Sequence, residues 1–109
     1  MNFNEFSKIV GLNNDEWNNY VINNLCNVKD NYLDSDIDKV TTIRFLLKIN
    51  TSIDDIKSYF YYLNNNKYND AIKIVKRIRK LKLDEIHAYQ RDLDILDCII
   101  RTNEIKMEG

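Results

Sequence analysis

The stretch IVGLNNDEWNNY, residues 9–20, is the part of the sequence that decides the fold. Its glycine, Gly11, ends an apolar helical pattern, and a short polar turn then leads into a second helix. Two helices joined by such a turn are typical of a helix-turn-helix, a unit that often reads DNA. The second helix carries Asp15 and Glu16 where a DNA-reading helix normally carries basic residues. The stretch therefore predicts a fold and leaves open whether DNA is the ligand.

The length and composition indicate one small folded domain, or a small domain with one long helix appended. The chain has 109 residues, of which 44% are hydrophobic and 30% charged, and this balance excludes a disordered chain. No uninterrupted apolar run approaches the ~20 residues needed to cross a bilayer, and no export or transit signal is visible. We therefore expect a cytoplasmic protein that does not associate with membranes.

The cysteine, glycine and proline content limits the chemistry and the turns. Cys26 and Cys98 lie far apart without partners at metal-ligand spacing, so we expect two buried thiols, no metal and no cofactor. Proline is absent and glycine occurs only at Gly11 and Gly109. The turns must then be built from asparagine and aspartate, which tolerate a positive φ.

The net charge of −1 conceals an asymmetry along the chain. Residues 1–40 contain three basic and seven acidic side chains, whereas residues 41–109 contain thirteen basic and ten acidic ones. A helix-turn-helix at the N-terminus that grips phosphates is expected to show the opposite bias.

Residues 1–68 are predicted to form one helix-turn-helix domain. Its first helix ends at Gly11, and its second is capped by Asn13 or Asn14 and ends near Asn24. Residues 25–33 are too few for more than a tight two-stranded ribbon or a loop. We expect the apolar stripes of these two helices to consist of Phe3, Phe6, Ile9, Val10, Trp17, Tyr20, Val21 and Ile22.

A second helix-turn-helix joint is predicted around Asn50, which suits the left-handed turn conformation. The candidate caps of the two helices that meet there are Asp34, Ser35 or Asp36 for the first, and Thr51 or Ser52 for the second. Their apolar positions are Ile37, Val40, Ile43, Leu46, Leu47, Ile53, Ile56, Phe60 and Leu63. An asparagine-rich turn then closes the domain.

Residues 69–109 are predicted to form one long coiled-coil helix. Apolar residues follow alternating steps of three and four, with a phase shift near residues 81–83. The predicted seam consists of Ile86, Tyr89, Leu93, Leu96 and Ile100, and Ala71, Val75 and Ile78 repeat the same steps earlier. A helix of this length cannot bury that seam against its own small domain, so we expect a homodimer.

Two helix-turn-helix joints, a miniature wing between them and a long C-terminal helix together resemble the MerR family of bacterial transcription regulators. NEFSKIVGL, residues 4–12, matches the opening helix of the family and its turn glycine. Tyr20 matches a tyrosine of the family's Arg-Tyr-Tyr element, and Leu25 matches the leucine that begins the wing. Tyr32 and Asp36 match the family's Tyr-Ser-x-x-Asp junction. Residues 37–60 then run along the family's helix, turn and helix without a gap. The resemblance covers residues 3–63 and implies an all-α, MerR-like winged helix-turn-helix with a minimal wing, followed by a coiled-coil dimerisation helix.

The departures from the family pattern concern the residues that contact the DNA phosphates. Asn18 stands where the family has an arginine before its paired tyrosines, and Leu47 stands at another common arginine position. The wing is reduced to NVKDNY, residues 27–32, with Lys29 as its only cation. Because each lost phosphate contact lowers the salt slope of duplex binding by about 0.9, these replacements would weaken binding by orders of magnitude.

The resemblance implies a small dimeric DNA-binding transcription regulator without a small-molecule sensor. The residues that we expect to contact double-stranded DNA are Asn13, Asn14, Asn18, Asn19, Lys29, Arg44, Lys48, Lys57, Arg77 and Arg79. The last two belong to the basic run KIVKRIRKLK, residues 73–82, which is better explained as the solvated face of a helix but would supply backbone contacts if DNA is bound.

Two other functions remain open from the sequence. The acidic N-terminal face could bind another regulatory protein, as an antirepressor or an accessory to plasmid or phage partition would, or the chain could be a structural coiled-coil adaptor. No catalytic constellation is present, so we do not expect an enzyme.

Overall fold

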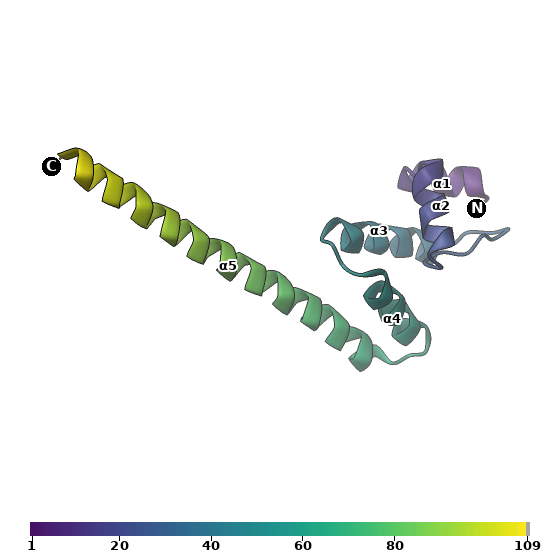
Figure 1. The fold of residues 1–109 in the computed structure, drawn as a ribbon. Coiled ribbons are helices and arrows are strands. Elements are labelled where there is room, and N and C mark those ends of the chain that lie inside the picture. The colour runs from purple at the N-terminus through teal and green to yellow at the C-terminus, as the bar shows by residue number, and fades with distance from the viewer. Residues whose placement is uncertain (109) are drawn as a thin grey trace. The chain divides into compact units, whose positions relative to one another are not determined.

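The computed structural model describes residues 1–108, and within them it contains five α-helices and no β-strand (Figure 1). The helices are α1 (Phe3–Val10), α2 (Asn14–Ile22), α3 (Asp34–Lys48), α4 (Ile53–Asn64) and α5 (Tyr68–Glu108). The predicted all-α class with a long C-terminal helix is therefore confirmed.

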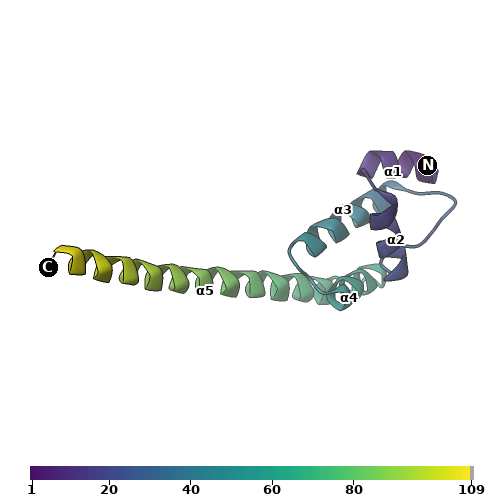
Figure 2. The same cartoon turned by 45° about the horizontal axis from the view of Figure 1, so that its top comes forward.

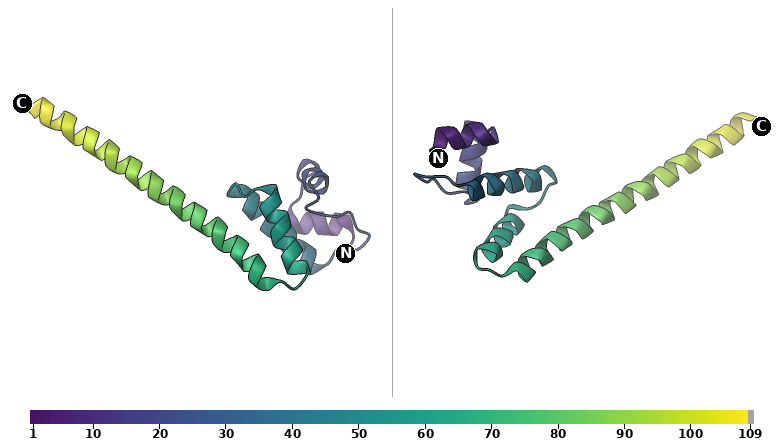
Figure 3. Two further views of the ribbon diagram at one scale, coloured as in Figure 1. Left: turned by 60° about the horizontal axis from the view of Figure 1, so that its bottom comes forward. Right: turned by 180° about the vertical axis from the view of Figure 1, so that it is seen from behind.

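The chain divides into two compact units. Unit 1 comprises Met1–Ile74, and unit 2 is the remainder of α5 from Val75 onward. α5 begins at Tyr68, so its first turns, which contain the buried Ala71 and Ile74, fall within unit 1. Figure 3 shows that α5 continues without a break through the division.

The turns of unit 1 follow the asparagine and glycine positions. Gly11 has φ 64°, and Asn24, Asn50 and Asn66 have φ values of 57°, 63° and 58°. In this region a β-carbon costs energy, and glycine and asparagine tolerate it best. The prediction that asparagine builds most turns, including the left-handed one at Asn50, is confirmed.

The turns between α1 and α2 and between α3 and α4 have the caps expected from the sequence. After α1, the backbone N–H of Gly11 donates to the carbonyl of Ser7. The side chain of Asn13 caps α2 by accepting a hydrogen bond from the N–H of Glu16 at 2.7 Å. Ser52 caps α4 in the same way, accepting from the N–H of Asp55 at 3.1 Å.

The connection between α2 and α3 is a loop, one of the two alternatives that the sequence left open (Figure 2). Tyr32 anchors it, because its backbone N–H donates to the carbonyl of Met1 at 2.8 Å and its ring is buried. The expected caps of α3 are wrong, since Asp34 and Asp36 already lie inside the helix and the cap position falls on Leu33. Asp36 acts from within, accepting a hydrogen bond from the N–H of Leu33 at 2.8 Å.

An aromatic cluster forms the core where α1, α2 and the loop meet. The rings of Phe6 and Tyr32 are stacked with centroids 4.5 Å apart and planes 4° apart, and Trp17 meets both edge-on. Phe3 packs at the side of this cluster. Such pairs add about 0.5–1.5 kcal/mol each to the free energy gained from burial, so this cluster fixes α1 and α2 to the loop.

The apolar stripes of unit 1 are buried as expected, with a few exceptions. The buried residues include Phe6, Val10, Trp17, Tyr20, Val40, Ile43, Leu46 and Ile56. Ile22 is wrong as a core position, because it is the last residue of α2 and is 77% exposed. Ile9 is exposed too. Cys26 is buried as predicted, whereas Cys98 is exposed, in a part of α5 where every side chain from residue 89 to 108 is exposed.

Candidate nucleic-acid interface

The exposed face of α2 is where a DNA-reading surface was expected. It consists of Asn14, Asp15, Asn18, Asn19 and Ile22, which recur at helical spacing and are all exposed. The Asn19 side chain accepts a hydrogen bond from Asn23 at 2.7 Å. The amides of Asn14 and Asn18 therefore offer the polar contacts of this face, and α2 itself carries no cation.

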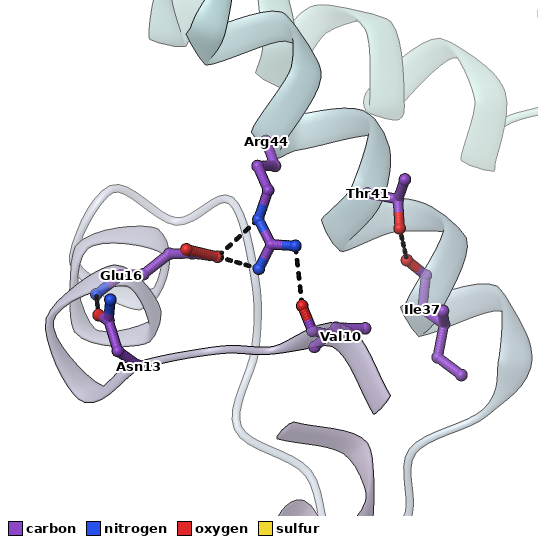
Figure 4. Close-up of polar contacts among 6 residues, drawn as sticks. All are labelled: Val10, Asn13, Glu16, Ile37, Thr41 and Arg44. Carbon is purple, nitrogen blue, oxygen red and sulfur yellow. Dashed lines mark hydrogen bonds and ion pairs between the residues drawn. The ribbon is translucent and has the colours of Figure 1, made fainter. Parts of the chain in front are cut away.

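Arg44 lies on α3 but points to the other helices of the first joint (Figure 4). Its Nε donates to Oε1 of Glu16 at 3.0 Å, Nη2 donates to the same oxygen, and Nη1 donates to the carbonyl of Val10 at 2.8 Å. Arg44 thus joins the end of α1, the start of α2 and the middle of α3. The guanidinium that was expected to contact phosphate is already engaged within the protein.

The pKa values of Arg44 and of Tyr20, which lies near the ion pair between Arg44 and Glu16, are both raised. The hydrogen bond with Glu16 raises the pKa of Arg44 and outweighs the opposing effect of burial. Burial, followed by the nearby Glu16 carboxylate, raises the pKa of the Tyr20 hydroxyl. Sequence reasoning missed this cluster, because Glu16 and Arg44 are 28 residues apart.

Lys29, the single cation of the loop, is also paired internally. Its Nζ lies 2.7 Å from Oδ1 of Asp36, and its backbone N–H donates to the hydroxyl of Tyr32 at 3.0 Å. Burial alone would raise the pKa of Asp36, but the hydrogen bonds from Lys29 and from the Leu33 backbone lower it. Lys29 therefore holds the loop against the start of α3.

The other predicted cations of unit 1 are exposed. Lys48 lies in the last turn of α3 and Lys57 in the middle of α4, and neither makes an ion pair among residues 1–108. Of the cations of unit 1 that were predicted to contact DNA, these two can reach a phosphate without breaking an ion pair among residues 1–108.

The basic run of α5 lies mostly in unit 2. Arg77 and Arg79 are exposed. Lys80 pairs with Asp84 at 3.3 Å, and Lys82 with Glu85 at 3.4 Å, both along the helix. Pairs of this kind are typical of a solvated helix face, so two of the cations in this run are partly neutralised by the helix itself.

The predicted seam of α5 is exposed in the single chain. Ile86, Tyr89, Leu93, Leu96 and Ile100 have exposed fractions of 52%, 68%, 58%, 54% and 55%. An apolar row of this length on one helix is unfavourable in water and indicates a surface to be covered.

Two hollows of unit 1 meet at the Lys29–Asp36 ion pair. An inner cavity of about 40 Å³ lies between the aromatic cluster and α3, and Cys26 is in its wall. Burial raises the pKa of the Cys26 thiol to about 11, so the thiol is protonated and unreactive at neutral pH. An open groove of about 500 Å³ lies on the outer side, between α3 and α4.

Comparison with known protein families, curated proteins and solved structures finds no match to this chain. Within residues 1–108, no three His, Cys, Asp or Glu side chains are grouped as ligands of a metal ion would be. In that same part of the chain, no helix has both the length and the apolar character needed to span a membrane.

Proposed function

We propose that the protein is a small dimeric, MerR-like DNA-binding regulator in which α2 is the reading helix and α5 holds two chains together. The observation that supports this best is the exposed polar face of α2, which follows directly on a helix-turn-helix joint. Asparagine can bond both N6 and N7 of adenine in the major groove, so Asn14 and Asn18 suit contacts to A·T base pairs.

The phosphate grip in this proposal comes from the exposed cations and not from Arg44 or Lys29. Lys48, Lys57 and Arg79 supply three exposed cations per chain. A dimer that used all of them would make about six phosphate contacts, and its affinity for random duplex DNA would then fall about 10³-fold between 50 and 200 mM salt.

A titration of the full chain against a random DNA duplex over that salt range tests the proposal. In the wild type we expect the logarithm of the affinity to fall steeply with the logarithm of the salt concentration, and we expect Lys57→Glu combined with Arg79→Glu to abolish binding. Lys106→Glu, which changes an exposed cation near the end of α5, is the matched control and should leave the slope nearly unchanged. A flat titration with no binding at low salt contradicts DNA binding.

A second function is favoured by a separate observation. The Arg44 and Lys29 side chains are held by Glu16 and Asp36, so the N-terminal face presents Asp15, asparagines and the exposed Ile22 but few available cations. Such a face suits a partner protein, and the chain would then act as an antirepressor or an accessory of a partition system.

The two functions differ in what α2 contacts. A photo-reactive residue placed at Asn18 should cross-link to duplex DNA in the first case. In the second case it should cross-link to one protein in the cell, and Ile22→Glu should abolish that product while Lys106→Glu leaves it.

A further inference from the structure

The open groove of unit 1 is formed by one face of α3, one face of α4 and the end of the loop. Ser35, Asp38, Lys39 and Thr42 recur at helical spacing on α3, and Tyr59, Phe60, Leu63 and Asn64 do so on α4. Its volume of about 500 Å³ is within the range of sites that bind small molecules. The groove is therefore large enough for a ligand of moderate size.

The floor of the groove is aromatic and apolar. Tyr59 and Phe60 are half-buried with ring centroids 5.1 Å apart, and Leu63 lies beside them, also half-buried. A planar ring placed here would gain apolar contact with the exposed parts of these side chains.

Lys39 provides the available charge of the groove. Its Nζ lies 5.2 Å from the centre of the Phe60 ring, and no carboxylate is within ion-pair distance of it among residues 1–108. Lys29, in contrast, is neutralised by Asp36. Because Lys39 is half-buried, a carboxylate that reached it would be partly shielded from water, which strengthens the hydrogen bond.

The rim of the groove adds neutral hydrogen-bonding groups and one negative charge. Ser35, Thr42, Asn27 and Asn64 supply hydroxyls and amides, and Asp38 offsets the charge of Lys39. The lining carries no net charge, and Asp38 would repel the second negative charge of a phosphate more than the single charge of a carboxylate.

We propose that this groove binds an aromatic carboxylate, with the carboxylate on Lys39 and the ring on the floor formed by Tyr59, Phe60 and Leu63. The proposal is independent of DNA binding, since the exposed face of α2 contributes no residue to the groove.

The test compares indole-3-acetate with its neutral isostere indole-3-acetamide, using amide chemical shifts of the full chain. We expect the resonances of Thr42 and Asn64 to shift with a dissociation constant of about 1 mM for the acid. The amide should bind about five- to tenfold more weakly, because one charged hydrogen bond is lost.

Matched variants separate the groove from the rest of the surface. Lys39→Met should bind the acid and the amide with equal affinity and should keep the spectrum of the folded protein. Lys48→Met, on the same helix outside the groove, should keep that difference. Leu63→Ala should lower the affinity for both ligands by the same factor. The proposal is overturned if neither ligand shifts these resonances at about ten times the expected dissociation constant, if both bind equally to the wild type, or if Lys39→Met keeps the preference.

Discussion

At the scale of single residues, Asp36 shows how one side chain can serve several elements. Its carboxylate accepts from Lys29 of the loop and from the N–H of Leu33 at the start of α3. An N-cap side chain would accept from an N–H of the first helical turn, whereas Asp36, the third residue of α3, accepts from the N–H of Leu33 at the cap position itself. A carboxylate in the first turn also interacts favourably with the helix dipole.

The stability that Asp36 supplies should depend on pH. Because its folded pKa is below the ordinary value of 3.8, its contribution is complete above that pH and is lost as the pH falls through the folded pKa. Asp36→Asn keeps an acceptor for the Leu33 N–H but removes the charge, and we expect it to cost about 1 kcal/mol at neutral pH.

Urea unfolding of the wild type and of Asp36→Asn checks this prediction. The difference between the urea concentrations at which the two proteins are half unfolded should disappear as the pH is lowered below 3.8. Asp38→Asn, at an exposed position of the same helix, should show little change at any pH. A gap that stays constant into acid would show that the charge of Asp36 contributes nothing.

At the scale of helices, the two joints are built from local capping and are then locked by contacts between elements. Asn13 and Ser52 cap α2 and α4, and Gly11 and Asn50 make the left-handed turns. The Arg44 guanidinium then ties α1, α2 and α3 together. The orientation of α2 thus depends on an ion pair as well as on the aromatic core.

The coupling between Glu16 and Arg44 can be measured by a double-mutant cycle with Glu16→Gln and Arg44→Met. The Arg44 side chain is 41% exposed, and solvent screening therefore limits the expected coupling to about 0.5–1 kcal/mol. Arg44→Met should cost more than Glu16→Gln, because it also leaves the carbonyl of Val10 without its donor.

The pair Lys80–Asp84 is the control for this cycle. Both side chains are highly exposed, at 76% and 56%, so Lys80→Met and Asp84→Asn should couple by less than about 0.5 kcal/mol. Equal coupling free energies in the two cycles would mean that the Glu16–Arg44 ion pair contributes no more than an exposed surface pair.

At the scale of the whole molecule, the chain combines a well-packed unit 1 with a helical unit 2 whose side chains are largely exposed. In unit 2 the seam from Ile86 to Ile100 has no covering element within the described chain, 1–108. The proposed DNA-binding function needs that seam to be covered by a second copy, because a dimeric DNA-binding protein places its two reading helices at a fixed separation.

The proposed dimer should dissociate when charge is placed on the seam. We expect sedimentation at micromolar concentration to report two 13.0 kDa chains for the wild type and one for the variant with Leu93→Glu and Leu96→Glu. The variant dimer loses the burial of four leucines and would bring four carboxylates into the seam, so the dissociation constant should rise by at least about 10³-fold.

Thr102→Glu provides the control, because Thr102 lies on another side of α5 from the seam. It should leave the dimer intact. A wild-type chain that sediments as a monomer contradicts the seam and, with it, the proposed dimeric regulator.

The helices and turns were determined by the sequence itself, because their causes are local. Apolar spacing places α1 to α5, and the left-handed turns fall on Gly11 and on asparagines such as Asn50. The caps at Asn13 and Ser52 depend on an N–H three residues away. Each of these interactions lies within one turn of helix, where composition and spacing are sufficient to predict it.

Only the tertiary structure decided which charged groups are available. Arg44 and Lys29 are cations that the sequence assigned to DNA, yet the fold pairs them with Glu16 and Asp36. It also turns α3 toward α4 so that Lys39 stands over Phe60 in an open groove. These partners are separated by seven to 28 residues in the chain. No local pattern encodes such pairs, because they come together only when the helices pack and water is excluded between them.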